Sequence, residues 1–188
     1  MVNKFCHFFL VACTLFSFSA AWGTTVVPPT FEELVSQAQE IFQGAVTDVR
    51  SEWAGAGAER HIVTYVTFRV EERFKGNAGA AYTIRLLGGT VGGETMLVTD
   101  APKFEVGDRD ILFVENNGSQ FVPLVGISHG RFRVDRDQTT GREVVMTNER
   151  KPVSDVLQLG RNQRAATAGT ALPIDQFKGA IRTKLANP

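Results

Sequence analysis

Hydrophobic residues recur at every second position through most of the chain between residues 41 and 146. Such alternation is typical of strands that bury one face and expose the other. In the segment 62–74, the two faces carry Ile62, Val66 and Phe68 against Tyr65, Thr67 and Arg69. We predict strands at 41–53, 62–74, 82–87, 95–98, 110–115, 121–125, 130–135 and 143–146.

Two stretches follow the helical period instead. Thr30 and Glu33 have the spacing of a capping box, in which each side chain satisfies a free backbone N–H of the other residue. The apolar positions that follow predict an amphipathic helix over 30–39. A second helix is predicted over 173–186, because Pro173 stands at its start and apolar residues recur at every third or fourth position.

Short strands separated by regularly spaced turn signals predict a mainly β fold, an antiparallel OB-like barrel with an N-terminal and a C-terminal helix. A parallel α/β sheet is disfavoured because no helical crossover fits between the strands. We divide the chain into a β-barrel domain with its N-terminal helix at 22–151, a linker at 152–172 and a C-terminal helix at 173–186. The linker assignment rests on a composition poor in large apolar residues.

The N-terminus has the composition of a secretion signal. Lys4 supplies a positive start, residues 5–18 are almost entirely apolar, and small residues follow. We predict a signal peptide at 1–21, with cleavage after Gly23 as the alternative, and an exported protein that is periplasmic or extracellular. No later segment has the length and apolar character of a membrane span.

Both cysteines of the chain, Cys6 and Cys13, lie within this leader. Its removal leaves no thiol for disulfides or nucleophilic catalysis, so packing alone must hold the exported domain. A retained membrane anchor and a lipid on Cys13 are the alternatives, the second because residues 10–13 resemble a lipoprotein processing box.

The charge balance argues against nucleic-acid binding. The chain carries 20 basic and 20 acidic residues, and loss of Lys4 with the leader leaves the exported part close to neutral. A nucleic-acid or anionic-membrane binder has a basic excess. Only His61 and His129 remain as histidines after the leader, and neither has a carboxylate at ligand spacing. We therefore expect no bound metal and no cofactor.

Four short motifs carry a resemblance to known proteins: Ile41 to Val46, Phe74 to Gly76, Tyr82 to Arg85 and Phe104 to Phe113. In this order they resemble the netrin-like module of the tissue inhibitors of metalloproteinases, whose fold is a five-stranded OB barrel with flanking helices. They resemble more closely a group of exported bacterial proteins with no established activity, which share the glycine pair near position 88 and the 123–134 stretch. The resemblance covers roughly residues 31–134 and implies a fold rather than a function.

The inhibitory mechanism of that family does not transfer to this chain. Those inhibitors chelate the zinc of the target protease through an N-terminal cysteine, and disulfides pin their barrels. The predicted exported chain contains no cysteine. The resemblance therefore implies a barrel without zinc chelation.

Two local motifs invite a catalytic or nucleotide-binding interpretation. The glycine-rich run 88–93 precedes a predicted strand rather than a helix, so we expect a bulged turn and not a phosphate cradle. Ser128 and His129 are adjacent, which on a strand would direct them to opposite faces, and no nucleophile-elbow pattern surrounds them. A hydrolase that uses this pair is the least favoured alternative.

We therefore predict a non-enzymatic, exported binding module for a protein or an envelope polymer. OB-type barrels bind through one sheet face and its loops. An exposed aromatic residue beside a mobile turn and polar residues on an open strand face are suitable contacts, which selects Trp53, Tyr65 and Arg69. The alternative is an inhibitor or chaperone of a co-exported protease that acts through its loops.

Overall fold

The computed structural model describes residues 27–187. The predicted signal peptide and Cys13 lie outside these residues. The strands are β1 (Glu40–Ala54), β2 (His61–Lys75), β3 (Ala81–Leu87), β4 (Gly89–Val91), β5 (Glu94–Met96), β6 (Arg109–Val114), β7 (Arg131–Arg136) and β8 (Glu143–Thr147). The helices are α2 (Phe31–Gln37), α3 (Gln163–Ala166) and α4 (Ile174–Ala186), with short 3-10 helices η1 (Gly57–Glu59) and η2 (Val156–Gln158).

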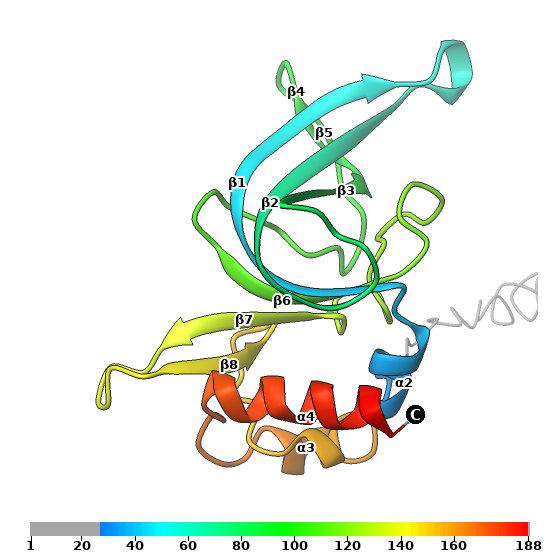
Figure 1. Cartoon of the computed structure of the whole chain (residues 1–188). Coiled ribbons are helices and arrows are strands. Elements are labelled where there is room, and N and C mark those ends of the chain that lie inside the picture. The colour runs from blue at the N-terminus through cyan, green and yellow to red at the C-terminus, as the bar shows by residue number, and fades with distance from the viewer. Residues whose placement is uncertain (1–26, 188) are drawn as a thin grey trace, which may run out of the picture.

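Six strands form one antiparallel sheet in the order β3-β2-β1-β6-β7-β8, and β4 pairs with β5 in a separate hairpin. The predicted mainly β, antiparallel architecture is confirmed. Strand pairing does not close the sheet within residues 27–187, because β3 and β8 form its two edges. Figure 1 shows β1 and β2 curving together over the upper half of the molecule, with the helices below β7 and β8.

The curvature of β1 follows from irregularities in its pairing with β2. The register shifts at three points along β1, between Ile41 and Phe42, between Gln43 and Gly44, and between Val46 and Asp48. A Cβ atom on Gly44 would lie 2.8 Å from the backbone oxygen of Arg69. Glycine therefore allows the backbones of β1 and β2 to approach closely at this point, and bulges of this kind bend and twist a strand.

Helix α2 begins as the capping box predicts. The Glu33 backbone N–H donates to Thr30 Oγ1 at 3.2 Å, and the Thr30 backbone N–H donates to Glu33 Oε2 at 2.7 Å. The helix ends at Gln37, two residues earlier than predicted, because the Gln39 backbone N–H already donates to the Val114 carbonyl at 2.7 Å. The switch from helix to strand is therefore immediate.

A first hydrophobic core lies between the β6–β8 part of the sheet and helices α2 and α4. Phe177 of α4 is fully buried at its centre. Its ring centroid lies 4.8 Å from that of Phe132, 5.8 Å from that of Phe31 and 6.5 Å from that of Phe113. We call this the helix-side core.

The segment 152–172 is not the surface linker that its composition indicates. It contributes three buried residues to the helix-side core: Val153, Leu159 and Ala166. Its backbone also covers β8, since the Val153 N–H donates to the Val145 carbonyl and the Val145 N–H donates to the Leu172 carbonyl, both at 3.0 Å. Small residues suit this position because the chain passes close to the strand edge.

A second core fills the curled upper half formed by β1, β2, β3 and β6. Phe68 is fully buried there, with its ring centroid 5.7 Å from that of Phe42 and 5.6 Å from that of Phe104. Residue 104 belongs to a loop and not to a strand. We call this the barrel-side core, and a loop therefore forms part of its boundary.

Residues 121–125 were predicted as a strand, but no regular strand forms there. The segment still runs antiparallel to the end of β6, because Leu124 bridges Val114, the Glu115 N–H donates to the Pro123 carbonyl at 3.2 Å and the Val125 N–H donates to the Phe113 carbonyl at 3.0 Å. The loop between the two segments reaches across to β3. The Asn117 side chain accepts the Arg85 backbone N–H at 3.0 Å and donates to the Thr83 carbonyl at 2.8 Å. The asparagine amide thus replaces a strand partner on the edge of β3.

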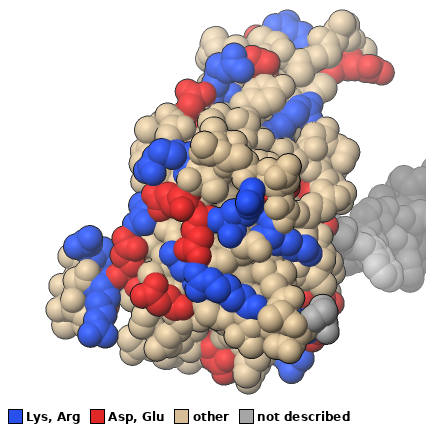
Figure 2. All heavy atoms as spheres, in the orientation of Figure 1, with Lys and Arg blue, Asp and Glu red and all other residues tan. Residues whose placement is uncertain are grey.

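None of the helices within residues 27–187 has the length and apolar character needed to span a bilayer. On the face drawn in Figure 2, basic and acidic side chains alternate and neither sign forms a continuous patch. This face therefore offers no single-sign surface to a polyanion or polycation.

Candidate binding cleft

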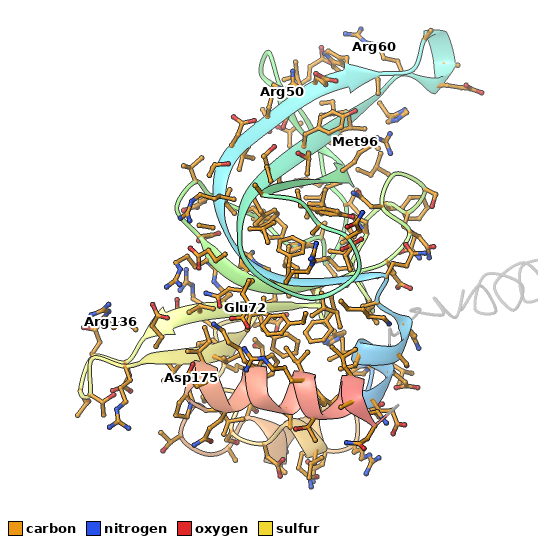
Figure 3. The ribbon with its side chains drawn as sticks, in the orientation of Figure 1. Arg50, Arg60, Glu72, Met96, Arg136 and Asp175 are labelled. Carbon is orange, nitrogen blue, oxygen red and sulfur yellow. The ribbon has the colours of Figure 1, made fainter. Side chains whose placement is uncertain are left out.

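A cleft of about 480 Å³ lies between the β4–β5 hairpin and the concave face of β1 and β2. One side is closed by residues 97–105, which we call the wall loop. Met96 at the end of β5 lies beside β2 and β3 in Figure 3 and contributes to the lining. The volume falls within the range of about 300–1,000 Å³ that is typical of ligand sites.

The floor of the cleft is the outer layer of the barrel-side core. Val66, Leu86 and Phe104 line the cleft and are 0%, 5% and 7% exposed. Val49 and Ala101 line it from the strand and from the wall loop, and both pack against the same core. A ligand group that enters the cleft therefore meets a continuous apolar surface held in place by a packed interior.

Hydroxyl groups form a small polar region beside this floor. Thr64 Oγ1 donates to the Gly88 carbonyl at 2.6 Å and lies 2.8 Å from Ser51 Oγ. Because the Thr64 proton is used on the carbonyl, Ser51 is the donor in the second bond. Thr90 and Thr95 form a separate hydroxyl pair at 2.9 Å across the β4–β5 hairpin.

The glycine pair allows the hairpin to cross these hydroxyls. Gly89 has a φ of +137°, and a Cβ atom there would lie 2.3 Å from Thr64 Oγ1 and 2.5 Å from Ser51 Oγ. Gly88 has a φ of +93°, and its Cβ would lie 2.7 Å from the Met96 carbonyl oxygen. A bulged turn was expected for 88–93, but residues 89–91 form β4 and the turn is confined to 92–93. Gly88 and Gly89 serve both backbone conformation and close approach.

A buried arginine fixes the wall loop. The Arg131 side chain is 0% exposed, donates through Nη1 to the Lys103 carbonyl at 2.6 Å, and places Cζ 3.9 Å from the Phe104 ring centroid. Its other nitrogens reach Asp108 at 2.7 Å and both carboxylate oxygens of Asp110 at 3.0 Å. The wall of the cleft is therefore tied to β6 and β7 by charge-assisted hydrogen bonds.

The two carboxylates differ in their surroundings. Burial raises the pKa of Asp110, and the adjacent Arg131 guanidinium opposes that shift. Partial burial also acts to raise the pKa of Asp108, but hydrogen bonds from the Glu105 backbone N–H and from Arg131 outweigh it, so the pKa of Asp108 is lowered. An ionised Asp108 accepts the Glu105 N–H at 3.0 Å, which adds a second tie to the wall loop.

The structure separates the three residues selected for binding. Trp53 shares its face of β1 with Val49 and Ser51, which line the cleft, so its side chain is on the concave face of the sheet. Tyr65 and Arg69 belong to the other, convex face, by the alternation along β2. The three residues do not form one surface, and the binding role of each stays a prediction.

Trp53 is half-buried and has a cationic neighbour. Arg60, labelled at the tip of the β1–β2 hairpin in Figure 3, places Cζ 3.9 Å from the Trp53 ring centroid. Tyr65 has a looser contact of the same kind with Arg50, at 5.6 Å. Arg69 pairs with Glu71 at 3.3 Å and its side chain is 63% exposed.

Ser128 and His129 lie in the turn that precedes β7. Ser128 is 8% exposed, and the adjacent cavity, with a volume of about 20 Å³, has room for about one water molecule. No hydrogen bond joins the serine to the histidine within the described residues. Burial lowers the pKa of His129, with Glu149 and Asp100 acting in the opposite direction.

His61 is in a different environment from His129. Its Nδ1 lies 2.7 Å from the Glu59 carbonyl oxygen and its Nε2 lies 3.3 Å from Arg85 Nη2. His129 instead borders Pro28, Pro29 and Leu34. Across residues 27–187 no group of three or more histidine, cysteine, aspartate or glutamate side chains has the geometry of a metal site.

Sequence reasoning missed the wall loop and the arginine behind it. The sequence did contain a signal for the buried arginine. Arg131 and Arg133 alternate in one predicted strand, and Asp108 and Asp110 alternate at the start of another. Charges at period two inside apolar strands indicate a buried ion-pair cluster if the strands are neighbours. No comparable pattern marks residues 97–103.

No protein-family model, curated protein or solved structure matches this chain.

Proposed function

We propose that this protein is an exported, non-catalytic binding module of OB-like, netrin-like architecture, and that its ligand site is the cleft between the β4–β5 hairpin and the concave face of β1 and β2. The observation that carries the proposal is an apolar cleft floor continuous with the barrel-side core and bounded by a wall fixed through Arg131. Binding sites are concave and mainly apolar, with a few placed polar groups.

The lining favours an apolar side chain of a protein partner over an envelope polymer. Lys103 and Glu105 put one charge of each sign on the lining, which gives no net attraction for a polyanion. Phe104 is the aromatic residue of the lining and is 7% exposed, so it offers little stacking area to a sugar ring. Aliphatic side chains instead have Val66 and Leu86 to contact.

The hydroxyls of the lining support binding rather than catalysis. Within the described residues, the Ser51, Thr64, Thr90 and Thr95 hydroxyls bond to one another or to the Gly88 carbonyl, and none bonds to a histidine or a carboxylate. A nucleophilic serine or threonine requires an adjacent base. The hydroxyls are suited to hydrogen bonds with the backbone of a bound segment.

Methyl-resolved NMR titration with N-acetyl-leucine amide tests this proposal. This probe presents one aliphatic side chain and two amides. We expect saturable shifts of the Val66, Leu86, Met96 and Ala101 methyl signals, and no shifts with N-acetyl-aspartate amide.

A cleft-filling variant supplies the control. Ala101→Phe places a ring in the cleft and should abolish the leucine-probe shifts, whereas Ala58→Phe, in the exposed turn at η1, should preserve them. Unchanged titration of the Ala101→Phe protein, or shifts confined to residues outside the cleft, would show that the site lies elsewhere.

A further inference from the structure

The distal half of β1 has a strand neighbour on one side only. Pairing with β6 covers residues Glu40 to Ala45, and Val46 exchanges backbone hydrogen bonds with Gly107 and Asp108 at 2.9 and 2.8 Å. From residue 47 to 54, β1 pairs with β2 and makes no backbone hydrogen bond on its other edge within the described chain. Figure 1 shows this part of β1 beyond the end of β6.

The pairing pattern identifies which backbone groups face this edge. On β2, the Ile62 carbonyl accepts from Gly88 at 2.8 Å and the Val70 N–H donates to Ala80 at 2.9 Å, both on the side of β3. Backbone groups alternate between the two sides of a strand, so the odd-numbered residues of β2 in this stretch bond to β1.

The register then fixes the orientation on β1. Val49, Ser51 and Trp53 lie opposite the even-numbered residues Val66, Thr64 and Ile62. In an antiparallel ladder such pairs exchange no hydrogen bonds with each other, so the N–H and C=O groups of these three β1 residues face outward. The edge presents a regular row of donors and acceptors, which is a template for another strand.

We propose that a second copy of this chain docks here, β1 against β1 in antiparallel orientation, with the two-fold axis at Ser51. In this register Ser51 pairs with the partner's Ser51, and Val49 pairs with the partner's Trp53. All three outward-facing residues of each copy are then hydrogen-bonded. A two-fold contact uses the same patch on both subunits and closes at two copies.

Charge complementarity favours this register over the centres one residue to either side. Arg50 and Glu52 lie on the convex face with side chains 64% and 44% exposed, and a centre at Ser51 places each Arg50 opposite the partner's Glu52. A centre at Arg50 would instead oppose two arginines, and would set Asp48 against the partner's Glu52. A centre at Glu52 would oppose two glutamates. Directly opposed opposite charges stabilise a strand pair, and like charges destabilise it.

The concave face gains an apolar contact in the same register. Trp53 faces the partner's Val49, and Val49 lines the cleft. Because the axis runs perpendicular to the sheet, the two clefts lie on the same face of a continuous sheet. The half-buried Trp53 is thereby covered by a residue of the partner, in addition to Arg60 of its own chain.

Sedimentation equilibrium of charge-reversed proteins tests the proposal. The wild-type protein should dimerise reversibly. Arg50→Glu and Glu52→Arg should each raise the dimer dissociation constant about tenfold or more, because each puts two like-charge pairs across the axis. An equimolar mixture of the two variants should dimerise like wild type, since only the mixed dimer pairs opposite charges. The matched control is Arg136→Glu at the β7–β8 turn, far from Arg50 in Figure 3.

The mixture separates the interface from effects within one chain. Arg50 and Glu52 also form a 3.3 Å ion pair within each chain, and mixing cannot repair that pair once either residue is reversed. Rescue on mixing therefore supports the two-fold contact. A wild-type protein that stays monomeric to millimolar concentration, variants that dimerise like wild type, or a mixture that stays as weak as its components would each overturn the proposal.

Discussion

β8 and the distal half of β1 each have a strand neighbour on one side only, but their free edges differ in how far other segments cover them. At β8, Val145 is hydrogen-bonded to Val153 and Leu172, and Pro152 and Pro173 bridge the same edge. At β1, the outward groups of Ser51 and Trp53 have no backbone partner among the described residues. One edge is protected within the domain and the other is left available.

The two hydrophobic cores differ in a similar way, because one is enclosed and the other opens to the surface. The helix-side core is enclosed by the sheet, by α2 and α4 and by the segment 152–172. The barrel-side core opens through Val66, Leu86 and Phe104 into the cleft. In the function proposed above, the helix half supplies stability and the other half supplies the binding surfaces.

The largest loss of stability should follow Phe177→Ala. Removal of a fully buried phenylalanine costs about 3–5 kcal/mol through lost transfer free energy and the cavity that remains. Denaturant unfolding measures this cost, and Phe121→Ala is the control because Phe121 is 70% exposed. If the halves are as distinct as proposed, the variant that remains folded should still bind the leucine probe. Loss of probe binding in fully folded Phe177→Ala protein would show that the helix-side core and the cleft are not independent.

Arg131→Met should come next, with a loss of about 3 kcal/mol, because it leaves Asp110 buried without its partner. It also removes the hydrogen bond to the Lys103 carbonyl, so the wall loop should become mobile and probe binding should weaken. Calorimetry and the NMR titration report the two effects.

The double variant Arg131→Met/Asp110→Leu identifies the cause. It removes both charges and should recover most of the lost stability. It should leave probe binding weak, because the tie to Lys103 is still absent. Recovery of both properties would show that Arg131 acts on the cleft only through stability.

Gly89→Ala should cost about 2–3 kcal/mol, since an alanine there combines a strained φ of +137° with contacts of 2.3 and 2.5 Å to two hydroxyls. Gly92→Ala, in the same hairpin, has a φ of +59° and no atom within 4 Å of its Cβ, so it should cost only about 1 kcal/mol. Thermal unfolding compares the two. Equal losses would mean that β4 does not press on the Ser51 and Thr64 hydroxyls.

The smallest effect should be a pH dependence from His129. Burial lowers the pKa of His129, so the folded state favours the neutral ring and unfolding takes up a proton. This contribution is complete above the unfolded pKa of about 6.5 and is lost as pH falls below it. Chemical unfolding of wild type and His129→Gln between about pH 8 and about pH 5 measures it. The variant should lose less stability over that interval, and an identical pH profile would contradict the assignment.

The strands and helices with strong periodicity were predictable from the sequence. β1, β2 and α4 keep the residues of each face in register with the core, so pattern alone located them within about two residues. The segment 121–125 was predicted only in part: it bonds to the end of β6, but it is a loop whose Val122 and Leu124 fill the end of the barrel-side core, and Asn117 bonds to the backbone of β3. A side-chain amide that takes the place of a strand's backbone groups leaves no periodic signal in the sequence.

The recognition surfaces were less predictable than the fold. Trp53 was selected as an exposed aromatic residue, whereas its side chain is half-buried. The face on which it lies depends on the bulge between Val46 and Asp48, which the pattern does not place. The cleft depends on the wall loop, whose position is set by Arg131, far away in sequence. Such sites arise from contacts between residues far apart in sequence. The glycine pair at 88–89 is the one local sequence feature that indicates the cleft.

Amide hydrogen exchange along β1 tests the difference between the two edges most directly. In dilute, monomeric protein the Ser51 and Trp53 amides should exchange much faster than those of Arg50 and Glu52, which bond to β2, and faster than the Val145 amide on the covered edge. At concentrations that favour the dimer, the Ser51 and Trp53 amides should become protected. Protection of Ser51 and Trp53 in dilute monomer, or exchange that stays equally fast at every concentration, would contradict this account.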